Sequence, residues 1–68
     1  MEKVKITTEY IKLDDLLKFT GVAESGGQAK FFIKEGLVTV DGEVCLMRGK
    51  KCRSGNVIKF EDNEFVIE

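Results

Sequence analysis

Apolar and polar residues alternate in several short stretches of the chain, and a period of two is typical of half-buried β-strands. In residues 3–7, Val4 and Ile6 fall on one side and polar residues on the other. This stretch is short and flanked by lysines, so we expect it at the edge of a sheet. Further strands are predicted at residues 37–40, 43–46, 57–60 and 64–67.

The period changes to that of a helix after the first strand. Leu13, Leu16 and Leu17 have the i, i+3, i+4 spacing of one apolar helix face, which predicts a helix over residues 13–20. Tyr10 could extend the same face backwards, so the sequence leaves the start of this helix open.

A second helix is predicted to begin at Ser25. Ser25 and Gln28 form a capping box, in which each side chain accepts a hydrogen bond from a backbone N–H at the helix start. Gly36 is expected to end this helix and Gly21 the first one, because glycine tolerates the left-handed backbone that follows a helix. The buried face of the second helix is expected to hold Ala29, Phe32 and Ile33.

The turns between the later strands are also marked in the sequence. Asp41-Gly42 is a strong two-residue hairpin signal, and residues 54–56 and Asp62-Asn63 are further predicted turns. The order strand, helix, helix, strands predicts one α+β domain over residues 1–68. We expect two helices packed on one side of a small, mostly antiparallel sheet of about four to five short strands.

Positive charge is concentrated in one part of the chain. The 68 residues carry a formal net charge of −1, yet residues 44–60 contain no acidic side chain. Four cations fall within six residues of this stretch, namely Arg48, Lys50, Lys51 and Arg53. Such a loop is often only solvated, but like charges repel unless an anion lies nearby. We therefore favour contacts with a phosphate backbone.

The residue inventory argues against catalysis and metal binding. The chain has no histidine to act as a general base and no glycine-rich phosphate loop, so we expect no enzyme, no metal and no cofactor. Cys45 and Cys52 are seven residues apart, which is not a metal-ligand spacing. They are either free thiols or one disulfide. Free thiols are favoured, because nothing in the sequence suggests export and a cytoplasmic location is expected.

Three residues of the second helix are further candidates for contact with nucleic acid. Lys30 and Lys34 are four residues apart and share a helix face. Phe31 lies beside that face and off the buried one. It either stacks on a base or ribose, or packs under the N-terminal segment, and the sequence favours neither.

Gly26 and Gly27 stand at the start of this helix, where each glycine costs roughly 0.5–1 kcal/mol relative to alanine. For Gly26 we favour a loop that needs unusual dihedral angles before the helix begins. For Gly27 we favour a functional explanation, in which bare backbone N–H groups at the helix N-terminus bind a phosphate.

The order of these motifs resembles that of the S-four RNA-binding domain, also called the alpha-L motif. The family pattern contains Arg-Leu-Asp, Ser-Arg-x-x-Ala, Val-x-Val-Asn-Gly and Pro-Gly-Asp-x-Ile, and the resemblance covers residues 11–60. The matching segments are Lys12-Leu13-Asp14, Ser25-Gly26-Gly27-Gln28-Ala29, Val38-Thr39-Val40-Asp41-Gly42 and Ser54-Gly55-Asn56-Val57-Ile58. The Gly-Gly-Gln-Ala-Lys and Arg-Gly-Lys-Lys runs are similar to those of small stand-alone bacterial members of the YaaA type.

The resemblance implies binding to structured RNA, either ribosomal or transfer RNA, through the two helices and the basic loop beside them. A link to the ribosome is expected, and we also expect a monomer without membrane contacts. Two departures weaken the expected contacts, since Gly26 replaces the family arginine and Lys12 replaces an arginine with its bidentate fork. The candidate RNA contacts are Lys12, Gly27, Gln28, Lys30, Phe31, Lys34, Arg48, Lys50, Lys51 and Arg53.

Three other classes of function are considered at this point. A protein-interaction adaptor, which keeps the fold but has weak or no RNA binding, is favoured by the missing arginine and the acidic C-terminal residues. A β-grasp sulfur carrier fits the many short strands, but the chain ends in Val66-Ile67-Glu68, without the terminal Gly-Gly that such carriers need. An RNA-modifying enzyme would require an attached catalytic domain.

Overall fold

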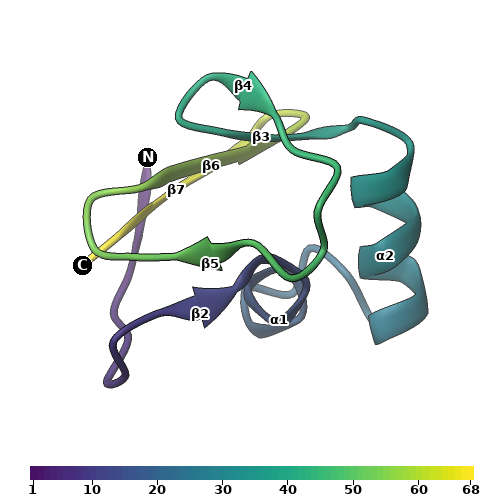
Figure 1. Ribbon diagram of the computed structural model, residues 1–68. Helices are drawn as coiled ribbons and strands as arrows, with labels where there is room; N and C mark the ends of the chain where they lie inside the picture. Colours follow the sequence, from purple (N-terminus) through teal and green to yellow (C-terminus); the bar gives the residue numbers. More distant parts are fainter.

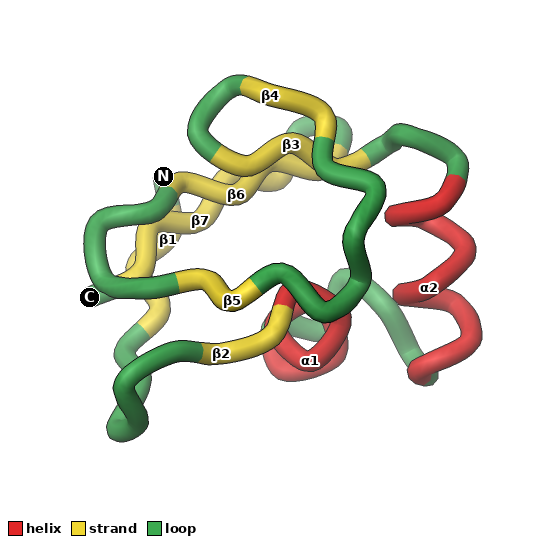
Figure 2. The backbone as a smooth tube through the Cα atoms, viewed as in Figure 1, coloured by secondary structure: helices red, strands yellow, loops and turns green.

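The strands of the computed structural model, which describes residues 1–68, form two sheets (Figure 1). The larger sheet has five strands in the order β1-β7-β6-β3-β4. Their bounds are Glu2–Val4 for β1, Asn63–Ile67 for β7, Val57–Phe60 for β6, Val38–Val40 for β3 and Glu43–Val44 for β4. The smaller sheet pairs β2 (Ile11–Lys12) with β5 (Lys51–Cys52). Figure 2 shows this pair in yellow, apart from the larger sheet and beside the first helix.

Neighbouring strands of the larger sheet are antiparallel except for β1 and β7, which run parallel. β1 lies at one edge of the sheet, so the prediction of an N-terminal edge strand is confirmed. It ends at Val4 rather than at Thr7, because its partner β7 ends opposite Val4, at Ile67. Two helices and a mostly antiparallel sheet confirm the predicted α+β class.

The two helices, α1 (Leu13–Phe19) and α2 (Gly26–Lys34), lie where the sequence predicts them. Tyr10 precedes β2 and is not part of α1. Gly21 and Gly36 follow the two helices with φ angles of 83° and 76°. Both glycines therefore adopt the left-handed conformation expected of residues that end a helix.

The capping box of α2 is only half as predicted. Ser25 Oγ accepts a hydrogen bond from the Gln28 N–H at 3.1 Å. Gln28 Oε1, however, accepts from the Glu24 N–H at 2.7 Å rather than from Ser25. The prediction for this second bond was wrong, because the long glutamine side chain reaches one residue beyond the N-cap.

The hairpin between β3 and β4 has the predicted turn. Asp41 and Gly42 have φ angles of 53° and 87°, so both are left-handed, as the tightest hairpin turns require. The turn before β7 lies one residue earlier than predicted, since Glu61 is left-handed (φ 54°) and β7 begins at Asn63. Glutamate is uncommon in that conformation, which is why the sequence favoured Asp62-Asn63.

Two other predictions about strands were wrong. β4 ends at Val44 and is therefore shorter than predicted, although the Cys45 N–H still donates to the Val38 carbonyl of β3 at 3.0 Å. β5 falls inside the stretch that we predicted as a basic loop. Strands of two residues are too short to show a period of alternation, so neither β2 nor β5 was detected.

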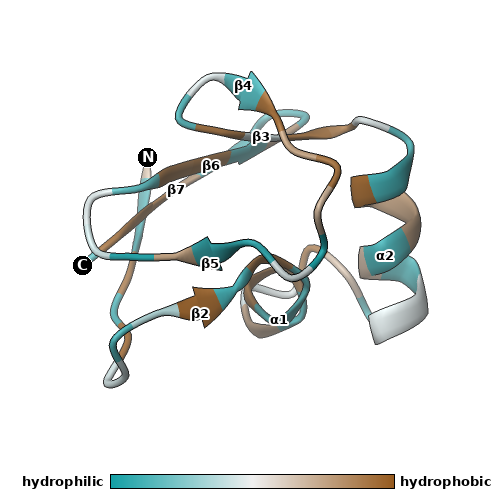
Figure 3. Cartoon of the chain, in the orientation of Figure 1, coloured by the Kyte–Doolittle hydropathy of each residue, from teal (hydrophilic) through white to brown (hydrophobic).

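The core lies between the helices and the inner face of the larger sheet. It contains fourteen buried residues, all of them hydrophobic. The three leucines of α1 are fully buried, as predicted, and so are Ala29 and Ile33 of α2. Phe32 is half-buried, and its ring centroid lies 4.5 Å from that of Phe60 on β6. Figure 3 shows in brown the apolar stretches of β6 and β7.

Neither helix is long and apolar enough to cross a membrane.

Candidate nucleic-acid interface

β2 and β5 form a two-stranded ribbon that brings together cations distant in the sequence. Lys12 lies opposite Lys51, and Ile11 lies opposite Cys52. Ile11 is half-buried and Cys52 buried, whereas both lysines are exposed, as the alternation of side chains along a strand requires. Like charges directly opposite each other destabilise a strand pair. The ribbon therefore holds two candidate RNA contacts side by side at a cost to the fold.

The basic segment, which we define as residues 48–53, is fixed against α1 by its backbone. The Leu13 N–H donates to the Lys50 carbonyl at 2.9 Å, and the Asp14 N–H donates to the Arg48 carbonyl at 3.1 Å. No side chain caps α1, so these carbonyls satisfy N–H groups that a helix start leaves free. The exposed side chains of Arg48 and Lys50 thus originate at the same end of α1 as Lys12.

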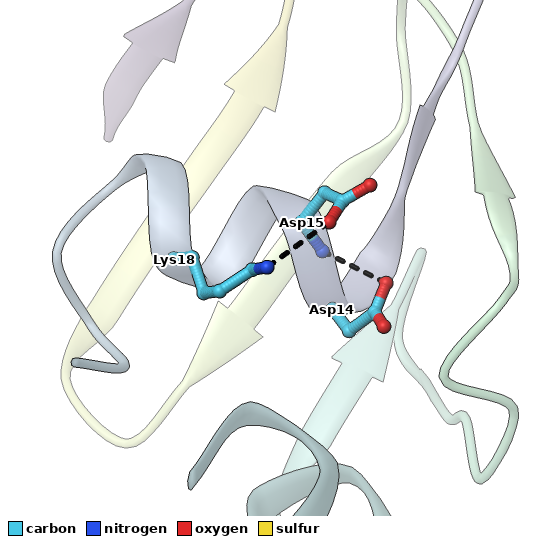
Figure 4. Close-up of polar contacts among 3 residues, drawn as sticks. All are labelled: Asp14, Asp15 and Lys18. Atoms are coloured by element: carbon cyan, nitrogen blue, oxygen red, sulfur yellow. Dashed lines mark hydrogen bonds and ion pairs between the residues drawn. The ribbon is translucent and has the colours of Figure 1, made fainter. Parts of the chain in front are cut away.

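The acidic side chains at the start of α1 are engaged locally (Figure 4). Asp14 Oδ1 accepts a hydrogen bond from the Asp15 N–H at 2.9 Å, and Asp15 Oδ1 lies 3.4 Å from Lys18 Nζ. Neither carboxylate forms an ion pair with a cation of the basic segment. The cations of the basic segment therefore have no ion-pair partner at this helix end.

The C-terminal end of the basic segment is tied to the β3–β4 hairpin. The Arg53 N–H donates to Asn56 Oδ1 at 2.7 Å. Asn56 Nδ2 in turn donates to Asp41 Oδ2 at 2.7 Å, and Asp41 Oδ1 accepts from the Val57 N–H at 2.8 Å. The left-handed Asp41 thus uses both carboxylate oxygens to fix the turn that follows Arg53.

Tyr10 is an aromatic contact of the basic segment that the sequence analysis did not assign. Lys51 Nζ lies 5.1 Å from the centre of the Tyr10 ring, and Arg53 Cζ lies 5.5 Å from it. From the sequence, Tyr10 was interpreted only as a possible extension of the first helix. The only sign of its role in the sequence is an aromatic residue next to β2, a strand that was not predicted. Its contacts with Lys51 and Arg53 depend on the pairing of β2 with β5, which the sequence does not reveal.

The remaining candidates lie on α2. Gln28, Lys30 and Lys34 are exposed, and neither lysine forms an ion pair. Phe31 is 56% exposed, and its ring meets that of Phe32 edge-on at 6.1 Å. This exposure argues against packing under the N-terminal segment, which was one of its two interpretations.

The two glycines at the start of α2 have helical rather than unusual backbone angles. Gly26 is the first residue of the helix, and neither Gly26 nor Gly27 has a positive φ angle. The explanation of Gly26 by unusual dihedral angles was therefore wrong. A side chain would also fit, since an added Cβ would lie 3.9 Å from Lys18 Nζ at Gly26 and 3.9 Å from Ser25 Oγ at Gly27.

The two groups of candidate residues are separated by α1, which packs against both α2 and β2 (Figure 1). The structure brings together Lys12, Arg48, Lys50, Lys51 and Arg53 at the ribbon and the start of α1. It places Gly27, Gln28, Lys30, Phe31 and Lys34 on the neighbouring helix. The candidates therefore form two adjoining groups rather than one continuous cluster.

No cation in either group is paired with a carboxylate. The two ion pairs of the protein are Lys3 with Glu68, at 3.8 Å, and Lys18 with Asp15. Of the acidic residues near the C-terminus, Glu61 and Asp62 form the turn before β7, Glu64 lies on β7 opposite Lys59 of β6, and Glu68 follows the strand. They form no ion pair with the basic segment, so its positive charge stays available to an external anion.

Both cysteines are free thiols. Cys52 is fully buried on the inner face of the ribbon, and this burial raises the pKa of its thiol from 9.0 to about 11, with a smaller contribution from nearby Cys45. A thiol with that pKa is neutral at physiological pH and serves as an apolar core side chain.

An exposed apolar patch lies beside the basic segment and was not anticipated. Val44, Leu46 and Met47 are 58%, 64% and 67% exposed. They border a pocket of about 410 Å³, which Lys50 also lines. Val44 is exposed although it lies on β4, and Leu46 and Met47 belong to the chain that leaves the sheet after this strand.

Two helices on one side of a small mixed sheet, with a separate cationic ribbon, define a small α+β domain of the alpha-L type. The S4 domain matches residues 4–68, and the chain belongs to this family. The predicted resemblance is therefore confirmed.

Several relatives are similar to this chain over most of their length. The Bacillus subtilis (strain 168) protein named "Probable ribosome maturation protein RlbA" is 41% identical over 58 residues, which are 85% of this chain and 82% of RlbA. Escherichia coli (strain K12) YbcJ is 45% identical over 51 residues, 75% of this chain and 73% of YbcJ. The solution structure of YbcJ, described as revealing an alfaL motif involved in RNA-binding, aligns with a TM-score of 0.74 and 35% identity. The alignment covers 98% of this chain and 86% of that one.

Proposed function

We propose that this protein binds structured RNA, with ribosomal RNA as its target, and that it does so in the cytoplasm without catalysing a reaction. The observation that carries the proposal is the pairing of Lys12 with Lys51 across a ribbon that has no carboxylate partner. Repulsion within the ribbon is relieved when an anion binds there. The description of YbcJ as RNA-binding and the name of RlbA support the choice of RNA and of the ribosome.

Recognition is expected to depend on the shape of the RNA. Double-stranded RNA exposes phosphates and 2′-hydroxyl groups more readily than base edges, and lysine and arginine side chains contact phosphates without reading sequence. The ribbon and basic segment form one wall of the proposed surface, and Lys30 and Lys34 on α2 form the other. α1 lies between the walls, so the RNA would lie across this helix.

The double charge reversal Lys30→Glu with Lys51→Glu tests both walls. We expect it to weaken binding of a ribosomal RNA hairpin sharply, and to reduce the slope of log K against log salt by roughly 1.5 if two phosphate contacts are lost. Affinities measured by fluorescence anisotropy at several salt concentrations give both quantities.

A matched control reverses Lys3 and Lys59, which are also exposed but lie on the larger sheet. Lys3→Glu with Lys59→Glu changes the net charge by the same amount. Comparing the two double variants therefore separates the effect of where the charges lie from the effect of net charge. If the two double variants lost affinity equally, or if neither did, the proposed surface would be wrong.

A protein-interaction adaptor is the second candidate function, and the exposed patch of Val44, Leu46 and Met47 is the observation that favours it. Contiguous exposed apolar side chains are typical of protein interaction sites. A partner captured from lysate that persists after nuclease treatment and at high salt would favour this function. Loss of that partner in Met47→Asp, with RNA binding intact, would assign the patch to it.

A further inference from the structure

The register of the ribbon places Tyr10 among the cations. Because Ile11 pairs with Cys52, continuing the pairing by one residue puts Tyr10 opposite Arg53. Residues two apart along a strand share a face, and diagonal neighbours across a strand pair are still within reach of long side chains. The outer face of the ribbon therefore carries one aromatic ring and three cations, which are Tyr10, Lys12, Lys51 and Arg53.

The distances agree with this arrangement. Lys51 Nζ and Arg53 Cζ lie 5.1 Å and 5.5 Å from the ring centre, within the distance of about 6 Å at which a cation is attracted to an aromatic face. The Tyr10 carbonyl accepts a hydrogen bond from Thr8 Oγ1 at 2.7 Å, which fixes the backbone that carries the ring. Neither cation has a carboxylate partner.

We propose that Tyr10 is a positioning residue of the RNA site, which orders Lys51 and Arg53 for contact with RNA phosphates while leaving their charge intact. This proposal rests on the function proposed above. A carboxylate in the same place would also hold the two cations, but it would cancel part of the positive potential that attracts phosphates. An aromatic ring attracts a cation through its quadrupole and adds no net charge.

The arrangement also lowers the cost of binding. Lysine and arginine side chains lose much rotamer freedom when a ligand immobilises them, and this loss reduces affinity unless the side chains are already ordered. Contact with a half-buried ring restricts Lys51 and Arg53 before RNA arrives. The ring itself is occupied by cations, so its role is to position them rather than to stack on a base.

NMR of the free protein tests the geometry. The side-chain protons nearest Lys51 Nζ and the Arg53 guanidinium are expected upfield of their usual shifts, because they lie over the Tyr10 ring. Tyr10→Phe should keep these ring-current shifts, and Tyr10→Leu should abolish them. Unshifted protons in the wild type would overturn the proposal without any reference to RNA.

Binding measurements test the role. Affinity for a fluorescently labelled ribosomal RNA hairpin is compared for wild type, Tyr10→Phe and Tyr10→Leu, each also combined with Lys51→Gln and Arg53→Gln. Tyr10→Leu is expected to weaken binding about fivefold, an effect of the size that two exposed cation–π contacts can supply, and Tyr10→Phe to leave it unchanged. Without the two cations, Tyr10→Leu should have no further effect, because a positioning residue then has nothing to position.

Thermal unfolding of every variant separates loss of fold from loss of binding. An equal loss of affinity from Tyr10→Leu with and without the two cations would overturn the proposal, since it would indicate stacking on RNA or general destabilisation. An effect of Tyr10→Phe as large as that of Tyr10→Leu would overturn it as well. If Lys51→Gln with Arg53→Gln left binding unchanged, the function proposed above would fail at this surface, while the ring-current shifts would still decide whether Tyr10 orders the cations.

Discussion

The lysines of the larger sheet and those of the ribbon differ in their neighbours. Lys3 on β1 pairs with Glu68, and Lys59 on β6 lies opposite Glu64. Lys12 and Lys51, in contrast, lie opposite each other, and neither has an acidic partner. A chain with a formal net charge of −1 can thus present a strongly positive surface, because the arrangement of charges on the fold decides the local potential.

Asp41 connects the larger sheet with the C-terminal end of the basic segment. Its loss is expected to have the largest effect on the free energy of unfolding. Asp41→Ala removes the acceptors for the Val57 N–H and Asn56 Nδ2 and puts alanine at a φ of 53°. Hydrogen bonds to a charged group contribute about 1.5–3 kcal/mol, so we expect the free energy of unfolding to fall by about 2 kcal/mol. RNA affinity should fall too, because Arg53 loses its support.

Urea unfolding measures this effect, and Asp62→Ala is the control, since Asp62 is an exposed aspartate in the other hairpin turn. A loss of stability confined to the control, or equal in both variants, would show that Asp41 does not join the two regions.

Lys12→Glu gives the ribbon the acidic partner that the sheet lysines have. The new glutamate would face Lys51, so strand pairing should gain up to about 0.5 kcal/mol while RNA affinity falls about tenfold at low salt. Opposite signs for stability and affinity are the expected signature, measured by unfolding and anisotropy on the same samples. If both rose or both fell, charge repulsion would not be the feature that distinguishes the ribbon.

The inner face of the ribbon is expected to respond to alkaline pH. Burial raises the pKa of Cys52 from 9.0 to about 11, so the folded state favours the protonated thiol. The contribution of the neutral Cys52 thiol to the free energy of unfolding is complete below pH 9 and is lost as the pH rises through 11. At pH 10 the loss is about 1 kcal/mol. Unfolding at pH 8 and pH 10 should show it in the wild type and less of it in Cys52→Ala, which cannot ionise at this position.

The smallest effect is expected on the sheet side of the comparison. Lys3→Gln removes an exposed ion pair of 3.8 Å, and such pairs contribute about 0–1 kcal/mol. We therefore expect less than about 0.5 kcal/mol of change in stability and no change in RNA affinity. A clear loss of affinity would extend the proposed surface onto the larger sheet.

Much of the fold could be predicted because its signals are local. The leucine spacing of α1, the Ser25 cap and the Asp41-Gly42 turn each depend on residues a few positions apart. The ribbon could not be predicted in this way, because its strands have two residues each and lie far apart in the sequence. Local signals thus gave the helices and the hairpin, and missed the element that organises the basic surface.

The same distinction applies to the candidate site. The cations of the basic segment were identified from composition alone, since no acid interrupts them. Tyr10 was missed because its contacts with Lys51 and Arg53 exist only in the correct strand register. At Gly26 the family has an arginine that this chain lacks. Lys18 Nζ lies 3.9 Å from the position that a Cβ at Gly26 would occupy, so a cation is present nearby. Only the packing of α1 beside α2 shows this.

The backbone caps of α1 have a consequence for how this surface can diversify. The N–H groups of Leu13 and Asp14 are bonded to the carbonyls of Lys50 and Arg48, and every amino acid possesses a carbonyl. Positions 48 and 50 can therefore exchange side chains without removing the bonds that hold them against the helix. The charge of this part of the surface can thus change through substitutions at these two positions while the backbone that supports it stays the same.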